Sequence, residues 1–209
     1  MCKTRTAQRG SALIEFVLAT GLLLVPLLLG TIVFGLNLIR ANQVTSVCRD
    51  AAHMFSYDVD FTQTASKNLL MQLAQGLNMT SNGGNGVIIL SKITYVDQSD
   101  CDDAGITSTD CTNEGEAVVV QRIYIGQKSL HKSAFATPDD TIVDPSTGDI
   151  KNTNYLKNAS AKALGFHANV MSLLTSGHYA YMAEMFVTSP DYSFGNSFGS
   201  QSISARSIF

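Results

Sequence analysis

Residues 16–39 read FVLATGLLLVPLLLGTIVFGLNLI and contain no charged side chain. As an α-helix, these 24 residues would span about 36 Å, whereas the hydrocarbon core of a bilayer is about 30 Å thick. The stretch also lacks the polar face that a helix in a soluble domain shows. We therefore expect Phe16 to Ile39 to cross a membrane rather than to form a buried core helix.

The charges on either side of the apolar stretch predict its orientation. Three basic residues precede it: Lys3, Arg5 and Arg9. Arg40 and Arg49 follow it with Asp50 nearby, and the chain after residue 10 carries 11 basic and 17 acidic residues. Because basic residues favour the cytoplasmic side, we expect a cytoplasmic N-terminus and a body outside the inner membrane. The net charge of −3 gives no indication of nucleic-acid binding.

The apolar stretch does not resemble a cleaved secretory signal. Such signals have an apolar run of about 7–15 residues before a small-residue cleavage site. Here the run is longer and ends at Arg40 without an A-x-A pattern. We expect the helix to remain attached as an anchor.

The residues from Arg9 to Phe16, RGSALIEF, form the boundary with the membrane stretch. They resemble the leader of a type IV prepilin, which is short and basic, ends in Gly, and is followed by Glu at the fifth mature position. Cleavage after Gly10 by a prepilin peptidase would make Ser11 the new N-terminus and Glu15 the fifth residue. The resemblance therefore predicts a processing site at Gly10 and Ser11.

Glu15 is an ionisable residue at the start of a membrane helix, where a carboxylate costs about 2–3 kcal/mol if it is forced deep. The resemblance implies that Glu15 neutralises the new α-amine of a neighbouring subunit and so sets the register of the helix bundle. The alternative is a carboxylate that reaches the membrane interface and does nothing further.

The stretch from Ser11 to Asp58 is similar to the TadE/TadF-like pseudopilins of tight-adherence (Tad) pili. Glu15-Phe16 opens the apolar span, Phe34-Gly35 closes it, and Cys48-Arg49-Asp50-Ala51-Ala52 follows. One departure is that the only proline of the span is Pro26, whereas the family often places it a few residues after Glu-Phe. The resemblance implies partners of three kinds: other pilins and pseudopilins bound through the N-terminal helix, the prepilin peptidase, and the inner membrane.

The rest of the chain predicts a small α+β body. The first helix continues to about Ser56 on an apolar stripe, and Asp60 is expected to cap a second helix over Phe61–Leu77. Three runs have strand composition: 87–96, 117–125 and 178–188, although the last could also be helical. A loop over 137–153, a short helix over 154–164 and a loose or partner-paired tail over 192–209 complete the prediction.

The four cysteines, Cys2, Cys48, Cys101 and Cys111, form no metal-binding pattern. Cys101 and Cys111 lie ten residues apart on a polar loop. We expect a disulfide between them, which requires an oxidising compartment such as a periplasm. The alternative is two free thiols in a cytosolic loop, and the state of Cys48 stays open.

No motif for catalysis or cofactor binding stands out. The histidines are scattered, no G-x-S-x-G elbow occurs, and the glycine-rich stretch 81–86 lacks the ending of a phosphate loop. The acidic residues between Asp97 and Asp110 could hold calcium but lack EF-hand spacing, which favours a solvated loop. We expect a non-enzymatic protein with no cofactor, no metal and no small-molecule substrate.

Together these patterns predict an α+β chain with a leader at 1–10, a transmembrane helix at 11–40 and a periplasmic domain at 41–209. The domain is expected to hold an antiparallel sheet of about three strands with long loops. The predicted function is a minor pilin-like subunit that supports pilus assembly and adherence. The alternatives are a membrane-anchored periplasmic enzyme or binding domain, and an adhesin that does not polymerise.

Overall fold

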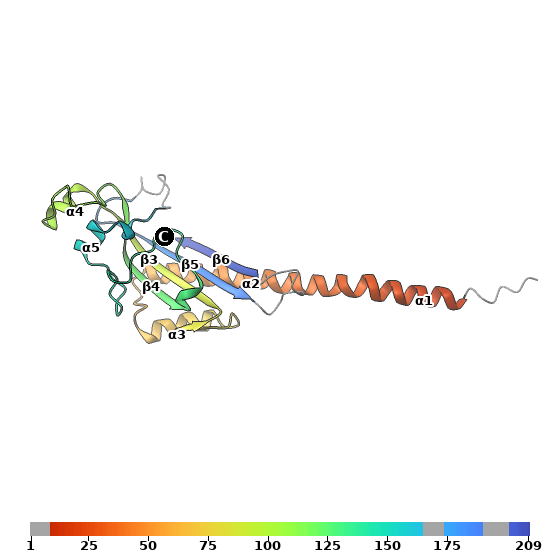
Figure 1. Ribbon diagram of the computed structural model, residues 1–209. Helices are drawn as coiled ribbons and strands as arrows, with labels where there is room; N and C mark the ends of the chain where they lie inside the picture. The colour runs from red at the N-terminus through yellow and green to blue at the C-terminus, as the bar shows by residue number, and fades with distance from the viewer. Residues whose placement is uncertain (1–8, 165–173, 190–200) are drawn as a thin grey trace, which may run out of the picture. The chain divides into compact units, whose positions relative to one another are not determined.

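The computed structural model describes residues 9–164, 174–189 and 201–209 (Figure 1). The chain divides into two compact units, residues 1–40 and residues 41–209, which we call the anchor and the body. The long N-terminal apolar helix and the antiparallel sheets of the body confirm the predicted α+β class.

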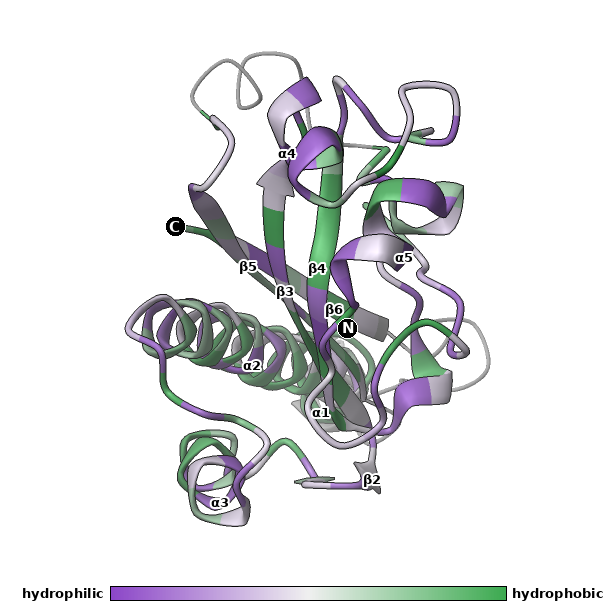
Figure 2. Ribbon diagram, turned by 90° about the vertical axis from the view of Figure 1, so that its left-hand side faces the viewer, coloured by the Kyte–Doolittle hydropathy of each residue, from purple (hydrophilic) through white to green (hydrophobic). Residues whose placement is uncertain are grey.

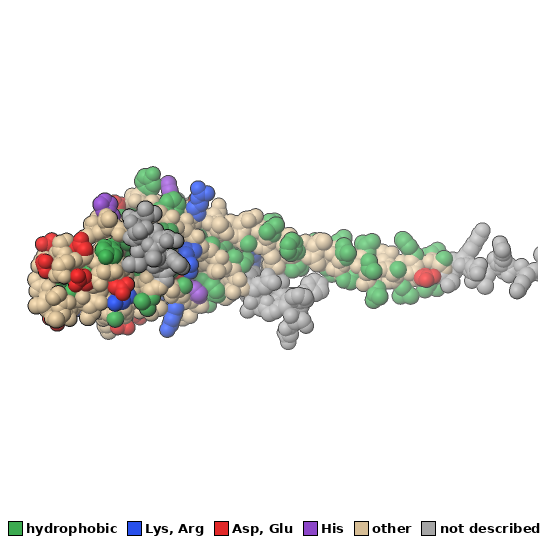
Figure 3. Space-filling model, turned by 90° about the horizontal axis from the view of Figure 1, so that it is seen from above, with side chains coloured by type: hydrophobic (Ala, Val, Ile, Leu, Met, Phe, Trp, Pro, Cys, Tyr) green, Lys and Arg blue, Asp and Glu red, His purple; other side chains and the backbone are tan. Residues whose placement is uncertain are grey.

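The anchor is helical from Arg9 onward. It consists of α1 (Arg9–Ala19), a π-helical turn η1 (Thr20–Leu24) and the first part of α2 (Val25–Ser56). The π turn lies just before Pro26, which has no N–H to donate to the carbonyl of Leu22 and whose ring crowds that carbonyl. The N–H of Val25 accordingly bonds to the carbonyl of Thr20, five residues back. Figure 3 shows hydrophobic side chains along the visible side of this helix.

The part of α2 that belongs to the body is amphipathic, as its sequence stripe predicts. Its buried residues recur at helical spacing: Val44, Val47, Cys48, Ala51, Ala52 and Phe55. The second helix, α3 (Thr64–Leu73), is shorter than the predicted Phe61–Leu77. The prediction that Asp60 is its N-cap is wrong, because Gln63 occupies that position. The carboxylate of Asp60 instead closes the preceding turn by accepting from the Thr62 N–H at 2.8 Å.

The main sheet has four antiparallel strands in the order β4-β3-β5-β6. The three strands predicted from sequence are β3 (Gly86–Tyr95), β4 (Ala117–Gly126) and β5 (Tyr179–Ser189). The fourth, β6 (Gln201–Ile208), lies in the segment that was expected to be a loose or partner-paired tail. That expectation is wrong for residues 201–208, which pair with β5 of the same chain. Residues 192–200 of the predicted tail lie outside the described residues. A separate two-stranded ribbon pairs β1 (Met79–Thr80) with β2 (Gly83–Gly84).

Both faces of the sheet are covered. Side chains of α2 and α3 pack on one face against Ile88, Leu90, Ile125 and Met185, which are buried. On the other face, the loop after β4 contributes Phe135, Ala136 and Ile150 to a second core. Figure 2 shows α2 and α3 on one side of the sheet, with α4 and α5 away from them. Each large apolar side chain that is fully buried in these layers contributes about 1.5–3 kcal/mol to folding.

Two short helices lie near the end of the sheet at which β3 ends and β4 begins. The first is α4 (Gln98–Asp103), which was not predicted. The predicted helix over 154–164 is α5 (Asn152–Lys157) followed by a 3-10 turn, η3 (Ala159–Ala161). A further 3-10 turn, η2 (Lys128–Leu130), follows β4.

Candidate functional site: the membrane anchor and the disulfide loop

The predicted processing site lies in the first turn of α1. The backbone of Gly10 and Ser11 is helical, because α1 begins at Arg9. The first turn of a helix has four N–H groups without partners inside the helix and opens easily. The Gly10–Ser11 bond therefore lies in a part of the helix whose backbone opens more easily than the interior does.

Glu15 lies one turn further along, and its side chain is exposed on the helix surface. It shares a shallow hollow with apolar side chains of the same helix: Ile14, Leu18, Ala19 and Leu22. Within the described part of the chain, no cation or hydrogen-bond donor contacts its carboxylate. In a bilayer, such a group is stable only if it reaches the interface or acquires a positive partner.

The glycines of the apolar helix leave open space beside the backbone. A Cβ built at Gly21, Gly30 or Gly35 would meet no heavy atom within 4 Å. Small residues allow the backbones of membrane helices to approach closely. The helix can therefore pack against another helix at these positions without a steric obstacle of its own.

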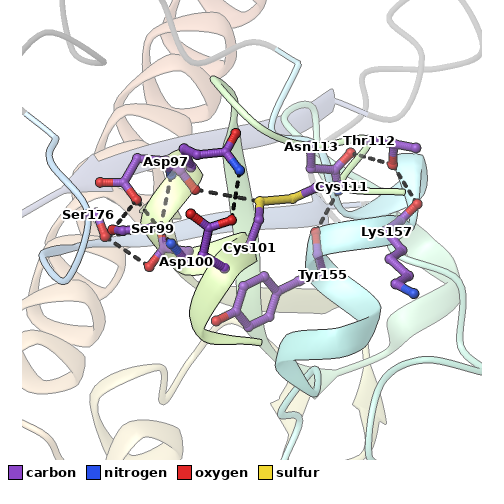
Figure 4. Close-up of a disulfide and its surroundings, with 12 residues drawn as sticks. Asp97, Ser99, Asp100, Cys101, Cys111, Thr112, Asn113, Tyr155, Lys157 and Ser176 are labelled. Carbon is purple, nitrogen blue, oxygen red and sulfur yellow. Dashed lines mark hydrogen bonds between the residues drawn. A yellow bond between two sulfur atoms is a disulfide. The ribbon is translucent and has the colours of Figure 1, made fainter. Parts of the chain in front are cut away.

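The disulfide loop is built around α4 (Figure 4). Cys101 and Cys111 are joined by a disulfide, with their Cα atoms 6.1 Å apart. Both half-cystines are buried in a small core with Val96, Val118 and Leu156. The disulfide thus joins α4 to the loop that follows it, and the two half-cystines pack against residues of the sheet and of α5.

Polar contacts complete this loop. Asp97 and Asp100 form a capping box at the start of α4, and the hydrogen bond from the Ser99 hydroxyl is the main cause that lowers the pKa of Asp97. Asp100 also accepts from the Ser176 hydroxyl at 2.9 and 3.0 Å. Asn113 donates to the carbonyls of Tyr155 and Asn158, at 2.6 and 2.8 Å. The acidic residues therefore serve as caps and acceptors of the loop itself.

Acidic side chains are nevertheless concentrated at this end of the body. Figure 3 shows them gathered at the end that carries α4. No three His, Cys, Asp or Glu side chains converge as metal ligands among residues 9–164, 174–189 and 201–209. The geometry of this loop is that of a cross-linked structural element.

The remaining histidines and Cys48 have packing roles. The ring of His53 lies against Tyr57 and Phe209, and the ring of His131 stacks on Phe186. His178 contacts the Thr175 hydroxyl through Nδ1 at 3.0 Å, and His167 lies outside the described residues. Cys48 is buried in α2 and its thiol donates to the Ala183 carbonyl at 3.3 Å.

A buried polar cluster on β5 was not predicted as a site. Glu184, which is 5% exposed, accepts hydrogen bonds from the Ser133 hydroxyl, the Ala134 N–H and the Arg206 guanidinium. Arg122 is 2% exposed on the same face of the sheet. Its guanidinium lies near Tyr124 and Glu184 but makes no hydrogen bond of good geometry to a described residue. Burial lowers the pKa of Arg122, which the nearby Tyr124 and Glu184 oppose. The one sequence signal for this cluster was the acidic residue in an otherwise apolar strand.

The anchor meets the length and composition requirements of a membrane span: the described helix Ala12–Ser56 contains a window apolar enough to cross a bilayer.

Residues 10–53 match the family model of TadE-like proteins.

This TadE-like segment covers the anchor and most of the amphipathic part of α2. The match confirms the resemblance predicted from Glu15-Phe16 and the residues that follow. No curated protein and no solved structure matched the chain. The TadE-like segment and the apolar helix together indicate a membrane-anchored protein that is associated with Tad pili and has pilus components as partners.

Proposed function

We propose that this protein is a minor pilin-like subunit, a pseudopilin, of a Tad pilus or a related secretion assembly. Its leader, residues 1–10, is removed by a prepilin peptidase. The α-helix that begins at Ser11 holds the body in the inner membrane with the N-terminus in the cytoplasm and the body in the periplasm. The protein acts without catalysis and supports pilus assembly and adherence.

The observation that carries this proposal is the position of Glu15 in the TadE-like segment. A carboxylate without a partner among the described residues lies one helical turn after the proposed new N-terminus. Cleavage after Gly10 creates an α-amine at the same depth, and an amine from a neighbouring subunit can neutralise Glu15. Because an unpaired charge in a membrane is costly, such a pair favours one helix register over others.

The body supports a structural role. Two of its cysteines, Cys101 and Cys111, form a cross-link that is stable in an oxidising compartment. Several polar residues serve the fold: the partly buried Asp97 and Asp100 cap a helix, and the buried Glu184 joins β5 to β6. An anchored domain whose polar groups are engaged in this way suits a subunit that binds other proteins.

The test is the mass of the mature protein purified from its native host. We expect a chain that begins at Ser11, with the full-length chain accumulating in a strain that lacks the prepilin peptidase. A chain that begins at Met1 or Cys2 in a host with an active peptidase would refute the pseudopilin proposal. That result would favour the anchored enzyme or binding domain.

A Glu15→Gln variant separates processing from assembly. We expect it to be cut after Gly10 like the wild type, because the cleaved bond is unchanged, and to fail to rescue piliation of a deletion strain. Equal rescue by this variant would exclude the role proposed for the carboxylate.

A further inference from the structure

The two edges of the main sheet differ in whether their backbone groups are hydrogen-bonded to the rest of the chain. On the β4 edge, the backbone is paired with loop segments: the Arg122 N–H donates to Gly148 at 2.7 Å, and the Ile150 N–H donates to Val120 at 2.8 Å. The Ala163 N–H donates to Ala117 of the same edge at 2.8 Å. At the opposite edge, β6 is the last strand (Figure 1), and no described residue pairs with its outer side.

The register identifies which backbone groups of β6 are open. Tyr181 and Phe209 exchange both backbone hydrogen bonds, each at 2.8 Å. Hydrogen-bonded pairs alternate along an antiparallel ladder, so the odd-numbered residues of β6 bond to β5. The N–H and C=O groups of the even-numbered residues point outward: Ser202, Ser204, Arg206 and Ile208.

This edge lacks most of the devices that usually prevent strand addition. Natural edges are protected by proline, by charged side chains, by bulges, by covering segments or by very short strands. β6 has eight residues, no proline or lysine, and an unbroken register with β5. Its one charged side chain, Arg206, is engaged with Glu184 at 3.1 Å and lies over the Phe135 ring. Among residues 9–164, 174–189 and 201–209, none pairs with this edge, so it can accept another strand.

The surroundings of the edge indicate the chemistry of that strand. Ile203 and Ala205 face α2 and are only partly buried, so apolar side chains beside them would complete the core. Phe209 contacts His53 of α2, and Arg49 comes one turn before His53. Gln43 bonds to Gln75 near α3 and so marks the other flank of α2, which places Arg49 on the flank towards β6.

Arg49 supplies a positive charge on this flank of α2. Arg49 is exposed and forms no ion pair with a described residue, and the strand itself carries no acidic side chain. We propose that the outer edge of β6 binds an extended segment of another pilin-like subunit as a fifth strand. That segment has alternating apolar residues and a carboxylate that pairs with Arg49. Backbone hydrogen bonds supply the affinity and the side chains supply the selectivity. This inference rests on the proposed pseudopilin function.

The experiment uses the full-length chain expressed in its native host from which the chromosomal copy is deleted. A photo-crosslinking amino acid replaces Ser202, beside the open edge. We expect a covalent adduct, with mass spectrometry locating the linked peptide in an acidic extended segment of another pilin-like subunit. An adduct with residues 201–209 of a second copy would overturn the proposed partner, and so would the absence of any adduct.

Two further variants test the geometry of the contact. Ser204→Pro removes an outward N–H and leaves the ladder with β5 intact, so we expect the adduct to fall at least tenfold while the melting temperature stays within a few degrees. Ser204→Ala is the matched control and should retain the adduct. Arg49→Glu should also weaken the adduct, whereas Lys67→Glu on α3 should not.

The outcome for piliation separates the two proposals. If the deletion strain forms normal pili, the pseudopilin function fails. If the deletion abolishes pili and the chain with the photo-crosslinking residue at position 202 restores them without forming an adduct, the function stands and strand addition at β6 is refuted.

Discussion

At the scale of single residues, the Cys101–Cys111 disulfide constrains the loop that contains α4. It closes a loop with a sequence separation of 10. In the chain-entropy treatment, restricting the unfolded chain in this way stabilises the folded state by about 2.5–3 kcal/mol. We expect the double substitution Cys101→Ser and Cys111→Ser to lower the free energy of unfolding by about that amount in urea titrations. Reduction of the wild type should have the same effect, and a reductant should not destabilise the variant further.

The buried thiol of Cys48 should make the folded state less stable as the pH rises into the alkaline range. Burial is the main cause that raises the pKa of its thiol from 9.0 to about 12. The folded state therefore favours the protonated thiol, and this contribution is complete below pH 9 and is lost as the pH rises towards 12. Stability should fall by about 1.4 kcal/mol for each pH unit in this window. Thermal melts of a Cys48→Ala variant should show a smaller alkaline loss, and equal slopes for the two proteins would contradict the assignment.

Arg122 is a charge that the fold buries without a hydrogen bond of good geometry to a described residue. Because burying a polar group without a hydrogen bond costs about 1–3 kcal/mol, we expect Arg122→Met to raise the free energy of unfolding by about 1–2 kcal/mol. Arg206→Met is the informative comparison. It removes the ion-pair partner of the buried Glu184 and should lower stability in the same urea titration. A loss of stability in Arg122→Met would show that the guanidinium has a partner.

At the scale of elements, the amphipathic part of α2 packs its buried face against the main sheet. Phe55 is 4% exposed and packs against Tyr181 and Phe61, with ring centroids 5.3 and 6.3 Å apart. Phe55→Ala should cost about 3–5 kcal/mol, because it leaves a cavity between α2 and the sheet. Thr45→Ala, at an exposed position of the same helix, should change stability by less than about 0.5 kcal/mol. Chemical denaturation of both variants checks this difference.

At the scale of the whole molecule, the charge distribution predicts its topology. The basic residues before the apolar stretch favour a cytoplasmic N-terminus, so the body should face the periplasm. Protease added to spheroplasts should degrade the body and spare a cytoplasmic control protein. Protection of the body until detergent is added would show the opposite orientation.

The sequence by itself determined the anchor, the amphipathic part of α2 and strands β3, β4 and β5, whose ends it placed within one residue. These elements depend on patterns that are local in the chain, namely an uncharged apolar run, a helical stripe and runs of β-branched residues. The TadE-like segment is also local, because Glu15-Phe16 and the residues up to His53 are contiguous in the sequence.

Only the tertiary structure decided the position of β6 and the buried cluster around Glu184. The stretch from Gln201 to Ile208 is rich in serine and has little strand signal, and it becomes a strand because β5 offers an unpaired edge and α2 covers Ile203 and Ala205. Glu184 meets Arg206 across that new pair of strands. Such contacts join residues that are far apart in the chain, and no local pattern of side chains specifies them.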